Sequence, residues 1–171
     1  LPIDVQAALT LVKVVTNDNG GTSTVSSFPL TATGPSTISG VSGTTDVTGR
    51  SVHPGSYALT EQTVASYTAS SWACTGGTQS GANVTLASGS SATCTITNND
   101  NPSHLTLVKT VTNDNGGTAT TASFPLTAAG PVTISGTSGS AGVTSALVSA
   151  GTYTLSEQTI ANYSASAWSC T

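Results

Sequence analysis

The chain has 171 residues, a formal net charge of −4 and only 6% charged residues. Its three basic residues are too few for a nucleic-acid-binding surface, and its longest apolar runs are too short to span a membrane. Thr, Val, Ile and Tyr favour strands, Gly-rich stretches favour turns, and no helical period persists, so the composition predicts an all-β protein.

Two interpretations fit the first residues of the chain. Apolar residues at the odd positions of 1–8 alternate with the others, as they do in a half-buried strand. The small residues near the end of this segment also resemble the tail of a signal peptide. We favour the strand and treat residues 1–8 as an N-terminal extension.

A series of short alternating segments follows, each bounded by turn residues. The first, 9–16, ends at the strong turn sequence Asn-Asp-Asn-Gly-Gly. Further strands are expected at 25–32, 36–41, 45–49, 56–63, 67–74, 83–87 and 92–98. This spacing predicts an antiparallel β-sandwich.

The chain repeats itself at an offset of 96 positions, so residues 9–75 return as 105–171. A tandem repeat favours a building block over an enzyme with one active site. We therefore expect a first sandwich at 9–99, a linker at 100–104, and a second sandwich at 105–171. The second sandwich lacks counterparts of the last two strands of the first.

The three cysteines divide into a pair and a single residue. Cys74 and Cys94 lie on predicted strands that flank the strand at 83–87, and a Ser/Thr-rich, apparently exported chain favours a disulfide over two buried thiols. Cys170 is the repeat counterpart of Cys74, and the 171 residues contain no counterpart of Cys94. Cys170 is therefore predicted to be unpaired, to bond another chain, or to have its partner in a continuation of the chain.

The only lysines and glutamates of the chain are related by the repeat. Lys13 corresponds to Lys109, and Glu61 corresponds to Glu157. Strand alternation places Lys13, Glu61 and Asn98 on the apolar faces of their strands. Because a lone buried charge is costly, these groups are expected to meet in the core.

Three short motifs carry a resemblance to a known family. Tyr-Ala-Leu-Thr-Glu at 57–61 and Tyr-Thr-Leu-Ser-Glu at 153–157, together with Leu-Val-Lys at 11–13 and Ile-Thr-Asn at 96–98, resemble the CnaB/SpaA prealbumin-like (Ig-like) domains of bacterial surface proteins and pilins. The likeness covers nearly all of 9–171.

The resemblance implies an intramolecular isopeptide bond in the first repeat. Lys13 would be the nucleophile, Asn98 the electrophile, and Glu61 the group that shuttles protons. Burial lowers the pKa of a lysine and so favours its nucleophilic neutral form. The alternative is a buried Lys–Glu salt bridge with a hydrogen-bonding asparagine.

The incomplete second repeat predicts a partner or a longer polypeptide. An open strand edge tends to pair with another chain. We expect residues 1–8 of a neighbouring copy to cover this edge, with Ile3, Asp4 and Val5 at the contact and Asp4 replacing the missing amide opposite Lys109. This segment supplies one strand where two are absent, and it contains no cysteine.

Two functional classes remain. The favoured one is a structural repeat subunit of an extracellular bacterial filament, pilus or surface stalk, whose partners are other copies of itself. The alternative is an adhesin that recognises a sugar or protein on a host or surface through loops at the ends of the sandwich. The sequence contains no catalytic constellation, metal-ligand cluster or cofactor motif, so neither turnover, a metal nor a cofactor is expected.

Overall fold

The computed structural model describes residues 5–171, and they divide into two compact units. The first unit ends at Asn101, and the second comprises Pro102–Thr171. Apart from two single-turn 3-10 helices, every regular element in the described residues is a β-strand. The predicted all-β, tandem-sandwich class is thereby confirmed.

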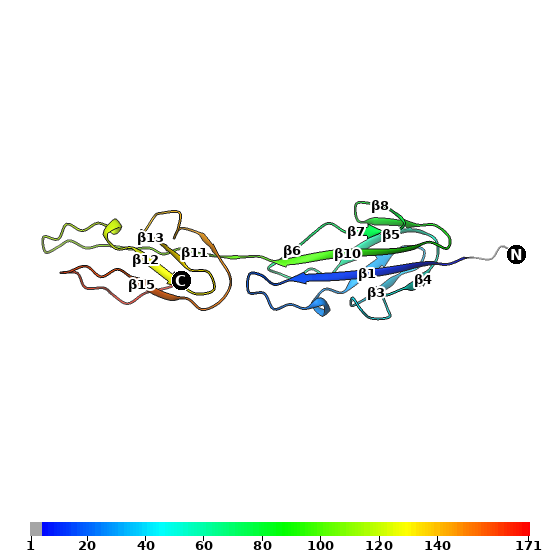
Figure 1. Cartoon of the computed structure of the whole chain (residues 1–171), viewed down its shortest axis with the longest axis horizontal. Coiled ribbons are helices and arrows are strands. Elements are labelled where there is room, and N and C mark those ends of the chain that lie inside the picture. Colours follow the sequence, from blue (N-terminus) through cyan, green and yellow to red (C-terminus); the bar gives the residue numbers. More distant parts are fainter. Residues whose placement is uncertain (1–4) are drawn as a thin grey trace. The chain divides into compact units, whose positions relative to one another are not determined.

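The described part of the first unit contains ten strands and one 3-10 helix (Figure 1). They are β1 (Ala7–Thr16), η1 (Val25–Ser27), β2 (Leu30–Thr33), β3 (Ile38–Gly40), β4 (Arg50–Val52), β5 (Gly55–Glu61), β6 (Tyr67–Ala69), β7 (Ala73–Thr75), β8 (Thr78–Ser80), β9 (Asn83–Leu86) and β10 (Ser91–Asp100).

Two sheets enclose the core of this unit. One has the order β4-β1-β10-β6, with β7 also paired to β10, and the other has the order β3-β2-β5-β9-β8. The long strands β1 and β10 run side by side (Figure 1) and are parallel, whereas the other pairs are antiparallel. The purely antiparallel sandwich expected from the sequence is therefore wrong for the central pair. Parallel neighbours require a long connection, which the intervening strands provide.

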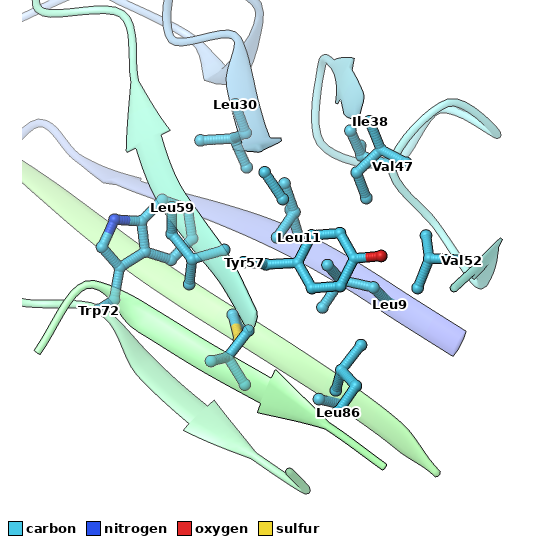
Figure 2. Packing of buried hydrophobic residues seen from close by; sticks show 14 of the residues in the cluster. Leu9, Leu11, Leu30, Ile38, Val47, Val52, Tyr57, Leu59, Trp72 and Leu86 are labelled. Atoms are coloured by element: carbon cyan, nitrogen blue, oxygen red, sulfur yellow. The ribbon is translucent and has the colours of Figure 1, made fainter. Parts of the chain in front are cut away.

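Strand alternation determines which residues enter the core. The inward positions of β1 are the alternate residues from Ala7 to Lys13, and those of β10 run from Ala92 to Asp100. In Figure 2 the ring of Tyr57 lies among aliphatic side chains from both sheets, including Leu9 and Leu86. Because interiors are close-packed, these contacts hold β1 and β10 in a defined position against the opposite sheet.

Several predicted boundaries differ from the structure. The segment 25–32 begins with η1, and 67–74 is divided between β6 and β7. The segment 45–49 is a turn rather than a strand. Val47 in this turn is fully buried and its carbonyl accepts a hydrogen bond from the Leu11 N–H at 2.8 Å, so burial at this position comes from tertiary packing and not from a strand.

The predicted extension and linker are both shorter than expected. Ala7 and Ala8 belong to β1, and Ala7 is buried, because pairing with β4 and β10 extends that strand toward its start. At the other end, β10 continues to Asp100 and the next strand begins at Ser103. Only Asn101 and Pro102 therefore lie between strands.

The second unit has fewer strands than the first. They are β11 (Ser103–Leu105), η2 (Thr121–Ser123), β12 (Leu126–Ala129), β13 (Ile134–Gly136), β14 (Ala146–Val148) and β15 (Thr154–Glu157). β11 pairs with β14, and β12 lies between β13 and β15. Its smaller core contains Leu107, Leu126, Ala128, Ile134, Val143 and Val148.

Two sets of strand pairs are absent from the second unit: those that β10 makes in the first unit, and those that β9 makes there with β5 and β8. Of the positions corresponding to β1, only 103–105 form a strand, and these match the part of β1 that pairs with β4. The counterparts of β6 and β7, which pair only with β10, form no strand. The last strand thus organises one whole sheet of the sandwich.

A disulfide joins β7 to β10 in the first unit. Cys74 and Cys94 face each other directly across this antiparallel pair and are covalently bonded, as the sequence predicted. The bond spans 20 positions, and cross-linking a loop of this length contributes about 3 kcal/mol in the chain-entropy model. The exposed Cys170 is not bonded within residues 5–171.

Candidate functional site

Three polar side chains from three strands meet in the first unit. The Lys13 Nζ on β1 lies 2.5 Å from the Asn98 Oδ1 on β10 and donates a hydrogen bond to it. The same Nζ lies 2.6 Å from the Glu61 Oε2, which comes from β5 in the opposite sheet. The structure therefore brings together the three residues that the sequence singled out for crosslinking.

This cluster is shielded from water. The side chain of Lys13 is 0% exposed, that of Glu61 is 8% exposed, and Asn98 is 2% exposed. The ring of Phe28 covers the amine, with its centroid 4.8 Å from Nζ. Electrostatic interactions are stronger in such a site than at the surface, because water does not screen them.

Burial changes the acidity of the lysine. Desolvation is the larger influence and lowers the pKa of the Lys13 ammonium below its ordinary value of 10.5, while the hydrogen bond and the charge of Glu61 oppose this shift. The neutral amine consequently forms at a lower cost in free energy than it does on a surface lysine. A neutral amine beside an amide carbonyl and a carboxylate is suited to nucleophilic attack on that carbonyl.

The neighbouring asparagine does not share this site. Asn99 is exposed, in keeping with its outward position on β10, whereas Asn98 is buried. Among the predicted assembly residues, Val5 is 47% exposed and its carbonyl accepts a 2.8 Å hydrogen bond from Ser88. Ile3 and Asp4 lie outside the described residues.

The second unit contains two of the three groups. Lys109 Nζ and Glu157 Oε2 are 2.6 Å apart, and the Phe124 ring centroid lies 4.6 Å from the amine. Their side chains are 17% and 14% exposed, so this pair is more accessible to water than its counterpart. Within the second unit, no amide oxygen occupies the position that Asn98 takes in the first.

Sequence reasoning missed a fourth buried polar residue, Asp100. Its carboxylate accepts hydrogen bonds from the backbone N–H of Asn19, at 3.0 Å, and of Gly21, at 2.5 Å. A side chain on Gly21 would collide with the Tyr67 hydroxyl and with Asp100, so this position requires glycine. The available signal was parity, because Asp100 shares the inward face of β10 with Asn98.

The Asp100 contact also gives the predicted turn at 17–21 a tertiary role. Burial by itself would raise the pKa of the Asp100 carboxyl, but the backbone hydrogen bonds from Gly21 and Asn19 outweigh it, and the pKa lies below its ordinary value of 3.8. The turn thus presents N–H donors to an anion. Residues 5–171 contain no cluster of three or more potential metal ligands.

Comparison with known families identifies the fold of both units. The SpaA_2 family, described as a prealbumin-like fold domain, matches residues 4–96 and again residues 100–171. The chain belongs to this family. No curated protein and no solved structure shows significant similarity to it.

The prealbumin-like match supports a coarse functional class. SpaA-type domains are typical of pilins and other extracellular surface proteins, and they are structural or surface modules rather than families of enzymes. The match therefore supports a pilin or surface-protein repeat in general. No helix in the described residues has the length and apolar character needed to cross a membrane.

Proposed function

We propose that this prealbumin-like chain is a structural repeat subunit of an extracellular filament, pilus or surface stalk. In this role the first unit is stabilised by the Cys74–Cys94 disulfide and by an isopeptide bond between Lys13 and Asn98. The observation that carries the proposal is the contact of the Lys13 amine with the Asn98 carbonyl oxygen in a buried site. A covalent link between the first and last strands would resist forces that pull the unit apart.

The proposed reaction is a single self-crosslinking event. The neutral Lys13 amine attacks the side-chain carbonyl carbon of Asn98, a new C–N amide bond forms, and the original C–NH2 bond breaks. Glu61, 2.6 Å from the amine, takes the amine proton and passes it to the departing nitrogen, which leaves as ammonia. Atoms and charge balance without an oxidant or a cofactor.

Intact mass spectrometry tests the crosslink. The folded wild-type chain should be lighter than its sequence mass by one ammonia, after allowance for the disulfide, and Glu61→Ala should restore the missing mass. Glu157→Ala is the matched control. The second unit offers no amide to Lys109, so this variant should keep the deficit of one ammonia relative to its own sequence mass. A wild-type chain that retains the ammonia would reduce the site to a buried ion pair.

The proposed assembly is head to tail, through strand addition at the second unit. The N-terminal segment of a neighbouring copy remains the candidate donor, without Ala7 and Ala8, which are part of β1. A head-to-tail contact that does not close into a ring produces a filament. Deletion of residues 1–6 should abolish the filaments seen by negative-stain microscopy. The control for folding is that the deleted chain has the same circular dichroism spectrum as the full chain. Filaments of the deleted chain would exclude this segment as the donor.

A further inference from the structure

A buried carboxylate at the end of β10 lies close to the proposed crosslink, and the crosslinking reaction itself does not use it. Asp100 is two residues after Asn98 on the same inward face, and it is 4% exposed. Successive inward residues of a strand are only about 7 Å apart, so a shift at Asp100 is passed along the backbone to Asn98. The contacts that hold Asp100 therefore also influence the position of the Asn98 carbonyl.

The turn at 17–21, which directly follows β1, holds Asp100. The backbone N–H groups of Asn19 and Gly21 donate to the Asp100 Oδ2 at 3.0 and 2.5 Å, and the Asn19 side-chain amide donates to the Asp100 backbone carbonyl at 3.0 Å. Hydrogen bonds to an ionised acceptor are about twice as strong as neutral ones. These contacts, named here the Asp100 latch, tie the end of β10 to the segment that carries Lys13.

The position of β10 against β1 requires such a fixed point. The two strands are parallel, so no tight turn connects them and sets their register. The Cys74–Cys94 disulfide fixes β10 before Asn98, and the Asp100 latch fixes it after Asn98. Without the latch, Asn98 would lie near a free strand end, and strand ends open more readily than strand centres.

The same turn is connected to the aromatic cover of the lysine. The Tyr67 hydroxyl donates to the Asn17 Oδ1 at 2.6 Å and accepts from the Ser23 N–H at 3.0 Å. The Tyr67 ring meets that of Phe28 edge to face with centroids 5.3 Å apart, and Phe28 lies over the Lys13 amine. The turn is thus held by a tyrosine on the lysine side and by a carboxylate on the asparagine side.

The tyrosine contacts do not depend on the carboxylate. In the second unit the Tyr163 hydroxyl donates to the Asn113 Oδ1 at 2.6 Å and accepts from the Ala119 N–H at 3.0 Å, and the Phe124 ring lies 5.3 Å away, although no residue there corresponds to Asp100. Removal of the Asp100 carboxylate is therefore expected to leave the cover over Lys13 in place. Its effect should be confined to the end of β10.

We propose that Asp100 is a positioning residue for the crosslinking reaction, which holds Asn98 within reach of the Lys13 amine by binding the turn at 17–21. Asp100 does not touch the reacting atoms and acts through the backbone of β10. This role rests on the proposed crosslink. A misplacement of about 1 Å can cost about 10²-fold in rate, so loss of the latch should slow bond formation at least about tenfold.

The test measures the rate of crosslinking in the full chain. Unfolded chain, in which the buried site has not formed, is recovered from urea-solubilised inclusion bodies and diluted into folding buffer. Circular dichroism and tryptophan fluorescence give the folded fraction. Samples quenched in acid and then reduced give, by intact mass, the fraction that has lost one ammonia, and the rate is expressed per folded molecule.

Four variants separate the latch from other effects. Asp100→Ala should lower the rate at least about tenfold, and Asp100→Asn, which keeps one acceptor oxygen, should recover part of it. Gly21→Ala disrupts the same contact from the turn, because the added methyl group would collide with Asp100, and its effect should be less than additive with that of Asp100→Ala. Asn99→Ala is the matched control on the exposed side of the same strand and should keep the wild-type rate.

The pH dependence of the rate distinguishes positioning from a general loosening of the core. If Asp100 only positions Asn98, its loss should lower the rate by the same factor from neutral to mildly alkaline pH and leave the midpoint of the profile unchanged. A core opened to water would move that midpoint toward the ordinary pKa of lysine, because the desolvation of Lys13 would be lost.

A wild-type rate in folded Asp100→Ala, or a shifted midpoint, would overturn the role of Asp100 and leave the crosslink standing. If Asp100→Ala does not fold, wild-type rates in both Asp100→Asn and Gly21→Ala would overturn it in the same way. A folded wild-type chain that never loses ammonia would overturn both the role of Asp100 and the crosslink.

Discussion

Replacement of Asn98 by alanine is the sharpest test of the crosslink by stability. It removes the acceptor and leaves the Lys13–Glu61 pair in place. Lys13 and Asn98 are 85 positions apart, and the disulfide already shortens the loop between them by 20 positions. Loss of a crosslink over the remaining loop costs about 4 kcal/mol in the chain-entropy model.

The alternative without a crosslink predicts a smaller effect. Loss of a single hydrogen bond to a charged group costs about 1.5–3 kcal/mol. With the crosslink, the covalent bond replaces that hydrogen bond, and its loss costs about 4 kcal/mol. The uncrosslinked denatured chain is also less compact, so the denaturant dependence of the free energy of unfolding should become steeper.

Guanidinium unfolding followed by tryptophan fluorescence measures both quantities. The background substitution Trp168→Phe leaves the buried Trp72 as the reporter of the first unit. Asn99→Ala is the matched control and should change stability by less than about 0.5 kcal/mol, because Asn99 is exposed. A loss below about 3 kcal/mol for Asn98→Ala with an unchanged slope would refute the crosslink.

Three further predictions concern the same unit. Replacement of both Cys74 and Cys94 by alanine should lower the free energy of unfolding by about 3 kcal/mol in denaturant titrations. Equal stability of the wild-type chain with and without reductant would contradict this prediction. In the Asn98→Ala background the Lys13 amine is free, and its lowered pKa means that the unfolded chain binds more protons than the folded chain. The free energy of unfolding should therefore rise with pH from the folded-state pKa up to about 10.5 and then level off. The reference for this comparison is a variant that also carries Lys13→Met. Because the pKa of Asp100 is lowered, its contribution to the free energy of unfolding should be present above pH 3.8 and lost as pH falls through the folded-state pKa. Asp100→Asn should therefore reduce the loss of stability at acid pH. An unchanged loss would exclude the Asp100 contact as its cause.

Alternation along single strands predicted the burial of Lys13 and Asn98. Lys13 shares its side of β1 with the core leucines, and Asn98 shares its side of β10 with Cys94. Side chains of a strand point alternately to opposite faces, so this property is local and can be counted along the chain. The 96-residue offset likewise revealed the tandem units, because repeated sequence folds into repeated structure.

Strand neighbours could not be predicted in the same way. The pairing of β1 with β10 is parallel and joins segments more than 80 positions apart, so no turn sequence specifies it. The strand positions near 45–49 were also misassigned, because Val47 is buried by a turn that packs on β1 rather than by strand alternation.

The sequence by itself therefore determined the inward faces, the repeat, the family and the residues with crosslinking chemistry. Tertiary structure alone decided the geometry: Asn98 Oδ1 lies 2.5 Å from Lys13 Nζ because the first and last strands are neighbours, and Glu61 reaches the same amine from the opposite sheet. It also decided the role of Asp100, whose donors lie about 80 positions away in a turn. The physical reason is that local alternation orients a side chain, whereas its partner depends on how distant strands pack around one core.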